Sequence, residues 1–214
     1  MCGFTGFFET THTLTLSQKE LAIQRMSEAL SHRGPNNQGI WIDPAAEIAL
    51  GHRRLSVIDL SPQGHQPMQS ACGQYVMVYN GEIYNYLEIR KELQNLGVTG
   101  WHGHSDTEVI LAAISHWGLE LAISKFTGMF AFALWDKKHR ALKLVRDRLG
   151  EKPLYYGWMN KTFLFGSELK ALCKYPGWQG EIDRSVVALF FRYNYIPAPY
   201  SIYRNIFKLL PGTF

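Results

Sequence analysis

Runs of aromatic and β-branched residues alternate along the chain with stretches of helical periodicity. The runs predict strands, because such residues pack well on a pleated surface. Strands are expected at residues 3–8, 38–42, 54–60, 75–79, 128–135, 141–146 and 162–166. Apolar positions three and four residues apart predict helices at residues 17–31, 84–96, 106–117, 168–174 and 184–192. Two of these helices begin with capping-box spacing, at Ser17 with Glu20 and at Ser105 with Glu108.

The predicted strands come in blocks that flank a helical middle. Regular βαβα alternation, which would indicate a doubly wound parallel sheet, is absent. We therefore expect an α+β fold with antiparallel sheets. No repeat or low-complexity linker interrupts residues 1–182, and these are expected to form one domain.

Composition and charge exclude several classes of protein. Hydrophobic residues make up 46% of the 214 residues and charged residues 19%, a globular mix rather than a disordered one. The net charge of +4 is scattered, so no basic face for nucleic acid is expected. No stretch approaches the ~18 apolar residues of a membrane helix, and MCGFTGFFETTHTL is not a secretory signal. Cys2, Cys72 and Cys173 have no metal-ligand spacing, so we expect no metal site and a cytoplasmic location.

Cys2 is the first candidate for chemistry. Met1 is usually trimmed when a small residue follows, and trimming would leave a thiol and a free α-amine on Cys2. Their unperturbed pKa values are about 8.5 and about 7.7–8.0, so the amine can accept the thiol proton near neutral pH. This arrangement provides a nucleophile and its base on one residue. A cysteine at position 2 can also be accidental, and its neighbours decide between these interpretations.

Several short strings follow Cys2 in a particular order. They are HRGPN (32–36), RLSVID (54–59), NGEIYN (80–85), Ser105-Asp106, GMFAFALWD (128–136), RDRLGEKPLYY (146–156), FGSELKAL (165–172) and YIPAPYSIYRNIFKLLPG (195–212). In this order the chain resembles the glutaminase domain of class II glutamine amidotransferases. It is most similar to the N-terminal half of glutamine-hydrolysing asparagine synthetase. The resemblance implies an αββα four-layer sandwich of two antiparallel sheets, the N-terminal-nucleophile hydrolase fold.

The resemblance also implies the site residues. Cys2 is the expected nucleophile, and the Asn80 amide and the Gly81 N–H are the expected donors to the charge that develops on the amide oxygen. Arg54 matches the position that binds the α-carboxylate, which a planar guanidinium suits. Asp106 matches the position that binds the α-ammonium. Further substrate-binding residues are expected at Leu55, Ser56, Val57, Ile58 and Glu82.

Some of these residues have structural alternatives. Asn-Gly is a strong hairpin signal, but a helical pattern follows Asn80-Gly81, so a hairpin is the poorer interpretation. Asp106 also suits the start of a helix, and both roles are compatible. The family usually carries aspartate where Asn36 stands, so a charge interaction is not expected there. Arg33 is expected to shape the loop near Cys2.

No string in the chain resembles a pyrophosphate-binding loop such as SGGxDS, GxxxxGKS or GxGxxG. We therefore expect a glutaminase domain at residues 1–182, and at 183–214 the start of the connection to a missing synthetase domain. The expected substrate is L-glutamine, hydrolysed through a Cys2 thioester without a cofactor. ATP and Mg are expected only in the missing domain. The leading expectation is that this domain makes asparagine from aspartate. Two alternatives stay open, another acceptor (a sugar or antibiotic precursor) and a non-catalytic scaffold, and a homodimer is also left open.

Overall fold

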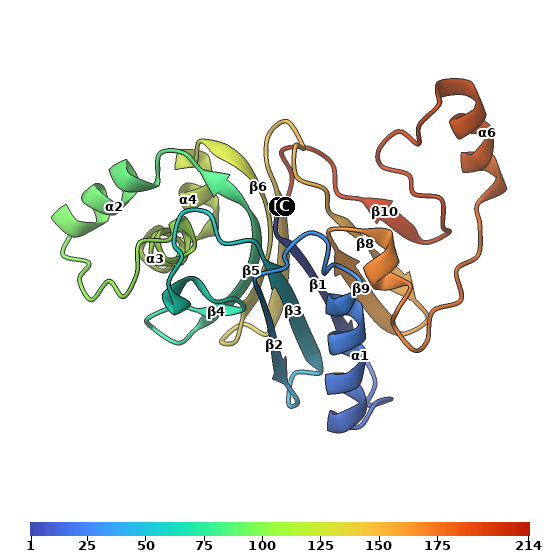
Figure 1. Ribbon diagram of the computed structural model, residues 1–214, viewed down its shortest axis with the longest axis horizontal. Coiled ribbons are helices and arrows are strands. Elements are labelled where there is room, and N and C mark those ends of the chain that lie inside the picture. The colour runs from blue at the N-terminus through green and yellow to red at the C-terminus, as the bar shows by residue number, and fades with distance from the viewer.

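Two antiparallel sheets packed face to face form the centre of the protein (Figure 1), in a computed structural model of residues 1–214. The larger sheet has the order β10-β8-β9-β1-β3-β2. Its strands are β1 (Gly3–Glu9), β2 (Asn37–Asp43), β3 (Ile48–Arg54), β8 (Tyr155–Met159), β9 (Thr162–Gly166) and β10 (Ile206–Lys208). The smaller sheet has the order β4-β5-β6-β7, with β4 (Met68–Gln69), β5 (Tyr75–Ile83), β6 (Gly128–Asp136) and β7 (Ala141–Arg146).

Helices cover the outer face of each sheet. α1 (Leu16–Glu28) and α5 (Leu169–Leu172) pack on the larger sheet. α2 (Tyr86–Asn95), α3 (Asp106–Trp117) and α4 (Leu119–Lys125) pack on the smaller one. The expected αββα four-layer sandwich is therefore confirmed. None of the helices combines the length and hydropathy needed to span a bilayer.

The inter-sheet core follows from the period of two along each strand, which sends successive side chains to opposite faces. Val76 and Val78 of β5 point between the sheets, where they join Phe4 of β1. Met77 and Tyr79 of the same strand point to the outer face and pack beneath α3. Even-numbered residues of β5 therefore face β1, and odd-numbered residues face α3.

The structure corrects several sequence predictions. The strand expected at 54–60 is wrong, because β3 covers Ile48–Arg54 and residues 55–60 form a loop. The pattern did not predict β4, β8, β10 or α4. α1 is capped by Thr15 and Gln18 rather than by Ser17 and Glu20. Ser105 does cap α3, but the Glu108 carboxylate accepts from the nitrogens of His102 and Gly103, so the capping box is incomplete.

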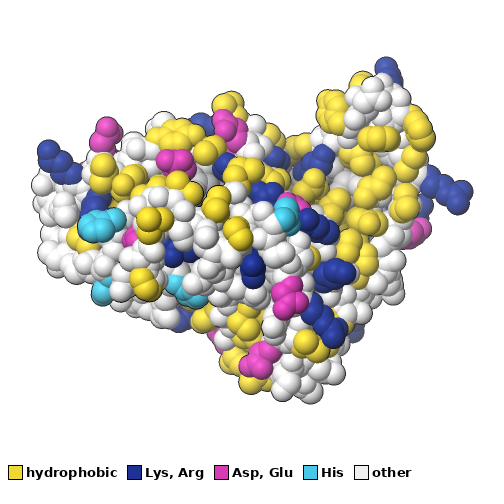
Figure 2. All heavy atoms as spheres, in the orientation of Figure 1, with side chains coloured by type: hydrophobic (Ala, Val, Ile, Leu, Met, Phe, Trp, Pro, Cys, Tyr) yellow, Lys and Arg dark blue, Asp and Glu magenta, His cyan; other side chains and the backbone are white.

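The last part of the chain contains a projecting helix and a strand of the larger sheet. β10 pairs with β8, whereas α6 (Arg184–Tyr193) stands away from the body (Figure 1). Figure 2 shows hydrophobic side chains gathered over this projecting region, and Phe190, Phe191 and Tyr195 are among the exposed ones. The expected boundary between 1–182 and 183–214 stays a prediction.

Candidate active site

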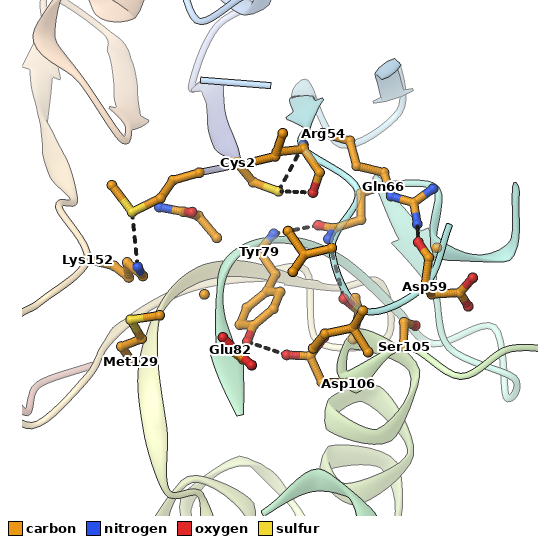
Figure 3. A pocket seen from close by; sticks show the side chains of 18 residues that line it. Cys2, Arg54, Asp59, Gln66, Tyr79, Glu82, Ser105, Asp106, Met129 and Lys152 are labelled. Carbon is orange, nitrogen blue, oxygen red and sulfur yellow. Dashed lines mark hydrogen bonds between the residues drawn. The ribbon is translucent and has the colours of Figure 1, made fainter. Parts of the chain in front are cut away.

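Cys2 lies directly before β1, where the strand order places it at the centre of the larger sheet and facing the smaller one. A cavity of about 150 Å³ opens beside it (Figure 3). The predicted site residues that line this cavity are Cys2, Arg54, Leu55, Val57, Ile58, Asn80, Gly81, Glu82 and Asp106. The fold therefore brings together residues that are scattered over a hundred positions of the sequence.

The Cys2 thiol is held by the loop that follows β3. Its sulfur lies 3.3 Å from the Leu55 nitrogen and 3.5 Å from the Leu55 oxygen. The carbonyl of Cys2 accepts a 2.8 Å hydrogen bond from Arg33 Nε, and Arg33 Nη1 pairs with Glu168 at 2.7 Å. The expectation that Arg33 shapes this region is thus confirmed. Burial raises the pKa of the Cys2 thiol. The Leu55 N–H, the N-terminal ammonium of Met1 and the positive charge of Arg54 offset part of that rise.

Gly81 presents its N–H to the cavity because of its register in β5. It lies opposite Phe130 of β6. Phe130 turns its backbone away from Gly81, since its nitrogen donates to Asp147 Oδ2 at 3.2 Å and its oxygen accepts from the Asp147 nitrogen at 2.8 Å. Gly81 and Phe130 are therefore a non-hydrogen-bonded pair, and the Gly81 N–H points away from β6. The strands approach so closely that a Cβ on residue 81 would lie 2.7 Å from Phe130 Cα.

Asn80 supplies a second donor. Its side chain is 1% exposed, and its Nδ2 atom is buried without a hydrogen-bond partner. Buried polar groups normally have partners, so an orphaned donor at a cavity marks a place for a ligand acceptor. The hairpin interpretation of Asn80-Gly81 is wrong, because both residues lie inside β5.

Arg54 ends β3 with a buried guanidinium (8% exposed). Nη1 donates to Ser61 O at 2.9 Å, and Nη2 donates to Asp59 O. Gly64 leaves room for the guanidinium, because a Cβ there would lie 2.7 Å from Arg54 Cζ. The Asp59 carboxylate accepts from the nitrogens of Ser61 (2.8 Å) and His104 (3.0 Å). The loop and the guanidinium therefore hold each other in place.

Asp106 is the first residue of α3 and is 5% exposed. Its Oδ2 atom accepts from the Tyr79 hydroxyl at 2.7 Å and from the Ile83 nitrogen at 3.0 Å. Burial raises the pKa of Asp106, an effect that these hydrogen bonds oppose. Glu82 lines the cavity nearby and forms no ion pair. The cavity thus has carboxylates on one side and Arg54 on another, which suits a zwitterion.

Ser56 is not among the cavity-lining residues, and its role stays a prediction. Its nitrogen donates to Asn36 Oδ1 at 3.1 Å, while the Asn36 nitrogen donates to Arg54 O at 3.0 Å. An asparagine therefore orders this loop without the charge that aspartate would bring.

Gln66, Tyr79 and Lys152 are among the residues of the cavity wall that sequence reasoning missed. Tyr79 had a usable signal, since it directly precedes Asn80-Gly81. Lys152 lies in the RDRLGEKPLYY string, and its Nζ lies 3.1 Å from Met1 Sδ (Figure 3). Gln66 follows the loop around Arg54 and had no signal of its own.

The family model described as glutamine amidotransferase domain matches residues 1–214. A putative asparagine synthetase [glutamine-hydrolyzing] 2 of Methanocaldococcus jannaschii is 39% identical, over 98% of this chain and 42% of that protein. The asparagine synthetase [glutamine-hydrolyzing] 1 of Bacillus subtilis is 38% identical, over 100% of this chain and 33% of that protein. A third relative, Amidase chry2 of Gibberella zeae, is 35% identical over 83% of this chain and 28% of that protein.

A solved structure supports the fold. The glutamine phosphoribosylpyrophosphate amidotransferase of B. subtilis superposes with a TM-score of 0.66 at 20% identity. The match covers 80% of this chain and 43% of that one. The chain thus spans less than half the length of the relatives named here.

Proposed function

This chain belongs to the glutamine amidotransferase domain family, and we propose that it hydrolyses L-glutamine to glutamate and ammonia through a thioester on Cys2. One observation carries the proposal. The Cys2 thiol and two unpaired donors, Asn80 Nδ2 and the Gly81 N–H, border one small cavity. A nucleophile beside oriented donors without partners is the arrangement that acyl transfer requires.

The proposed reaction begins after Met1 is removed. The freed α-amine of Cys2 accepts the thiol proton, and the sulfur attacks the side-chain carbonyl carbon of glutamine. The charge that develops on the carbonyl oxygen is stabilised by Asn80 and Gly81. The amine returns the proton to the departing nitrogen, which leaves as ammonia. Water then attacks the thioester, which releases glutamate and regenerates the thiol.

The two ends of glutamine explain the rest of the cavity. Arg54 is proposed to bind the α-carboxylate, because a guanidinium offers paired donors in one plane. Asp106 and Glu82 are proposed to bind the α-ammonium. Leu55, Val57 and Ile58 complete the wall, and no cofactor enters these steps.

We propose that the ammonia passes to a synthetase domain in a longer protein, where ATP and Mg activate aspartate for asparagine synthesis. The names and greater lengths of two relatives support this acceptor. Another acceptor is a second candidate, because a further relative is named Amidase chry2. A non-catalytic scaffold is disfavoured, since Cys2, Arg54, Asn80 and Asp106 are all present.

The test measures glutamate release from protein whose N-terminus has been defined by mass spectrometry. The processed form is expected to be active, and both the Cys2→Ala variant and a form that retains Met1 are expected to be inactive. Cys173→Ala, outside the cavity, is the matched control and should keep full activity. Glutamate release by Cys2→Ala would overturn the proposal, and full activity with Met1 retained would overturn the role of the amine.

A further inference from the structure

Tyr79 is a buried tyrosine (3% exposed) that lines the cavity. Its hydroxyl donates to Asp106 Oδ2 at 2.7 Å. Because Oδ2 also accepts from the Ile83 nitrogen, Oδ1 is left for a further donor. The hydroxyl therefore sets which carboxylate oxygen of Asp106 is available to a substrate ammonium.

The backbone of Tyr79 is fixed on both sides. Its nitrogen donates to Gln66 Oε1 at 2.7 Å, and its oxygen accepts from His52 Nε2 at 3.0 Å. Burial lowers the pKa of His52 to about 3, so its imidazole is neutral at ordinary pH and carries its proton on Nε2 to serve this carbonyl. On the edge of β5 that faces β4, only Val76 and Met77 pair with β4. The bonds to Gln66 and His52 therefore replace the inter-strand hydrogen bonds that Tyr79 lacks on this edge.

The carbonyl of Tyr79 belongs to the peptide group that it shares with Asn80. The hydrogen bond that the Tyr79 oxygen accepts from His52, and the one that the Tyr79 nitrogen donates to Gln66, therefore fix the backbone from which the Asn80 amide and the Gly81 N–H project. One residue thus connects the carboxylate proposed to bind the ammonium with the donors proposed to stabilise the oxyanion (Figure 3).

We propose that Tyr79 is a positioning residue with two separable parts, whose hydroxyl sets recognition of the α-amino group and whose backbone anchors set the oxyanion donors. This inference rests on the proposed function. It assigns specificity for an α-amino amide to a side chain that does not itself touch the reacting atoms.

Tyr79→Phe removes only the hydroxyl. It is expected to lower kcat/KM for glutamine about 10- to 100-fold, mostly through KM, because a hydrogen bond to a charged group is lost. Hydrolysis of 5-amino-5-oxopentanoic acid, which is glutamine without its α-amino group, should be unchanged. Gln66→Met removes the acceptor of the Tyr79 nitrogen and keeps the hydroxyl. It should instead lower kcat on both substrates equally.

Tyr175→Phe is the matched control. The Tyr175 hydroxyl also bonds a carboxylate, Glu9 at 2.9 Å, but it lies beneath α1 and α5, outside the cavity. The control should lose thermal stability and keep its kinetics. Equal kinetic losses in Tyr79→Phe and Tyr175→Phe, or equal losses on both substrates in Tyr79→Phe, would overturn the proposal.

The pH profile gives a second readout. The titratable groups that face Asp106 are Glu82 and Tyr79 of β5 and the Cys2 thiol. Loss of the Tyr79 hydroxyl removes a donor that favours the carboxylate form, so the acid limb of kcat/KM should move to higher pH. An unmoved limb would contradict the inference.

Wild-type protein that binds glutamine without hydrolysing it would overturn the proposed function alone. Titration calorimetry with glutamine then tests the hydroxyl, with the same 10- to 100-fold loss expected in Tyr79→Phe. Wild-type protein that fails to bind glutamine would overturn both proposals.

Discussion

The sulfur of Cys2 lies 3.3 Å from the backbone nitrogen of Leu55, so the loop after β3 donates directly to the candidate nucleophile. This donor favours a thiolate, but burial outweighs it and raises the pKa of the thiol. Raising the pKa favours the protonated form, so the resting thiol is protonated at neutral pH. Cys2 therefore needs a base, and the residue that carries the thiol can supply one.

Thiol labelling should show this difference between the cysteines. Burial raises the pKa of the exposed Cys72, but hydrogen bonds from Ser70 and other neighbours outweigh burial and leave it lowered. Iodoacetamide at neutral pH is therefore expected to modify Cys72 before Cys2. A glutamine analogue with an electrophilic side chain should add once, on Cys2, because binding places it there. Peptide mass spectrometry after timed labelling shows which cysteine each reagent modifies first. Preferential alkylation of Cys2 by iodoacetamide would contradict the prediction for that reagent.

Asn80→Ala should separate catalysis from stability. Loss of one oxyanion donor is expected to lower kcat about 10²- to 10³-fold. The melting temperature should change little, since Asn80 Nδ2 gives up no hydrogen bond. Asn85→Ala is the control with the opposite pattern, because Asn85 binds Lys125 O and the Thr127 nitrogen, each at 2.9 Å. It should lose about 1–3 kcal/mol of stability at unchanged kcat, and a kcat loss as large as that of Asn80→Ala would count against the donor role.

Arg54→Lys should weaken glutamine recognition through the α-carboxylate. Because lysine lacks the planar pair of donors, kcat/KM is expected to fall about 10- to 100-fold. With 4-aminobutanamide, which lacks the carboxylate, the loss should be smaller, because only the bonds from Arg54 to the Ser61 and Asp59 carbonyls are then affected. Arg53→Lys is the neighbouring control, since Arg53 binds Gly34 O and Gln38 outside the cavity. Steady-state kinetics with glutamine and with 4-aminobutanamide test this prediction. Equal losses of kcat/KM for the two amides would refute recognition of the carboxylate by Arg54.

Lys19→Met should expose a pH-dependent stability contribution far from the cavity. Lys19 Nζ is buried, 2.5 Å from Glu47 and 3.5 Å from Glu9. Its loss is expected to cost about 3–5 kcal/mol near pH 7, because two buried carboxylates lose their counter-ion. Burial raises the pKa of Glu47, but hydrogen bonds from Lys19 and His12 outweigh burial, and the net pKa is lowered.

A lowered folded-state pKa means that this stabilisation is present above about pH 4.3, the unfolded value, and disappears as the pH falls through the folded value. The difference between wild-type and variant unfolding free energies in urea should therefore shrink as the pH is lowered below about 4.3. A difference that stays constant as the pH falls would show that the ion pair of Lys19 with Glu47 does not cause the stability difference.

The identities of most site residues could be predicted because they lie in short strings that resemble those of a known family, and the same resemblance implied the layer architecture. Cys2, Asn80-Gly81 and Asp106 each lie within a recognisable string, and the structure places all of them on one cavity. Their convergence depends on the pairing of β1 with β3 and on the packing of the two sheets. No local pattern contains that information.

The segment around Arg54 shows where a local pattern fails. Residues 55–60 include four apolar residues, two of them β-branched, yet they form the loop beside Cys2, with Val57 and Leu60 exposed. The strand is Ile48–Arg54, whose glycine, histidine and arginines read as polar. It pairs on both edges, and Gly51 permits the contact with Ser27 of α1, so tertiary packing overrides propensity.

The placement of Asn80-Gly81 inside β5 also affects how the protein ages. In a flexible chain an Asn-Gly pair loses ammonia readily, because the glycine nitrogen can reach the asparagine side-chain carbon and close a five-membered imide. In β5 the extended backbone directs the Asn80 side chain between the sheets and the Gly81 N–H toward the strand edge, so this ring cannot close. Storage should therefore spare the Asn-Gly sequence that the fold holds at its cavity, and unfolding should expose it to deamidation.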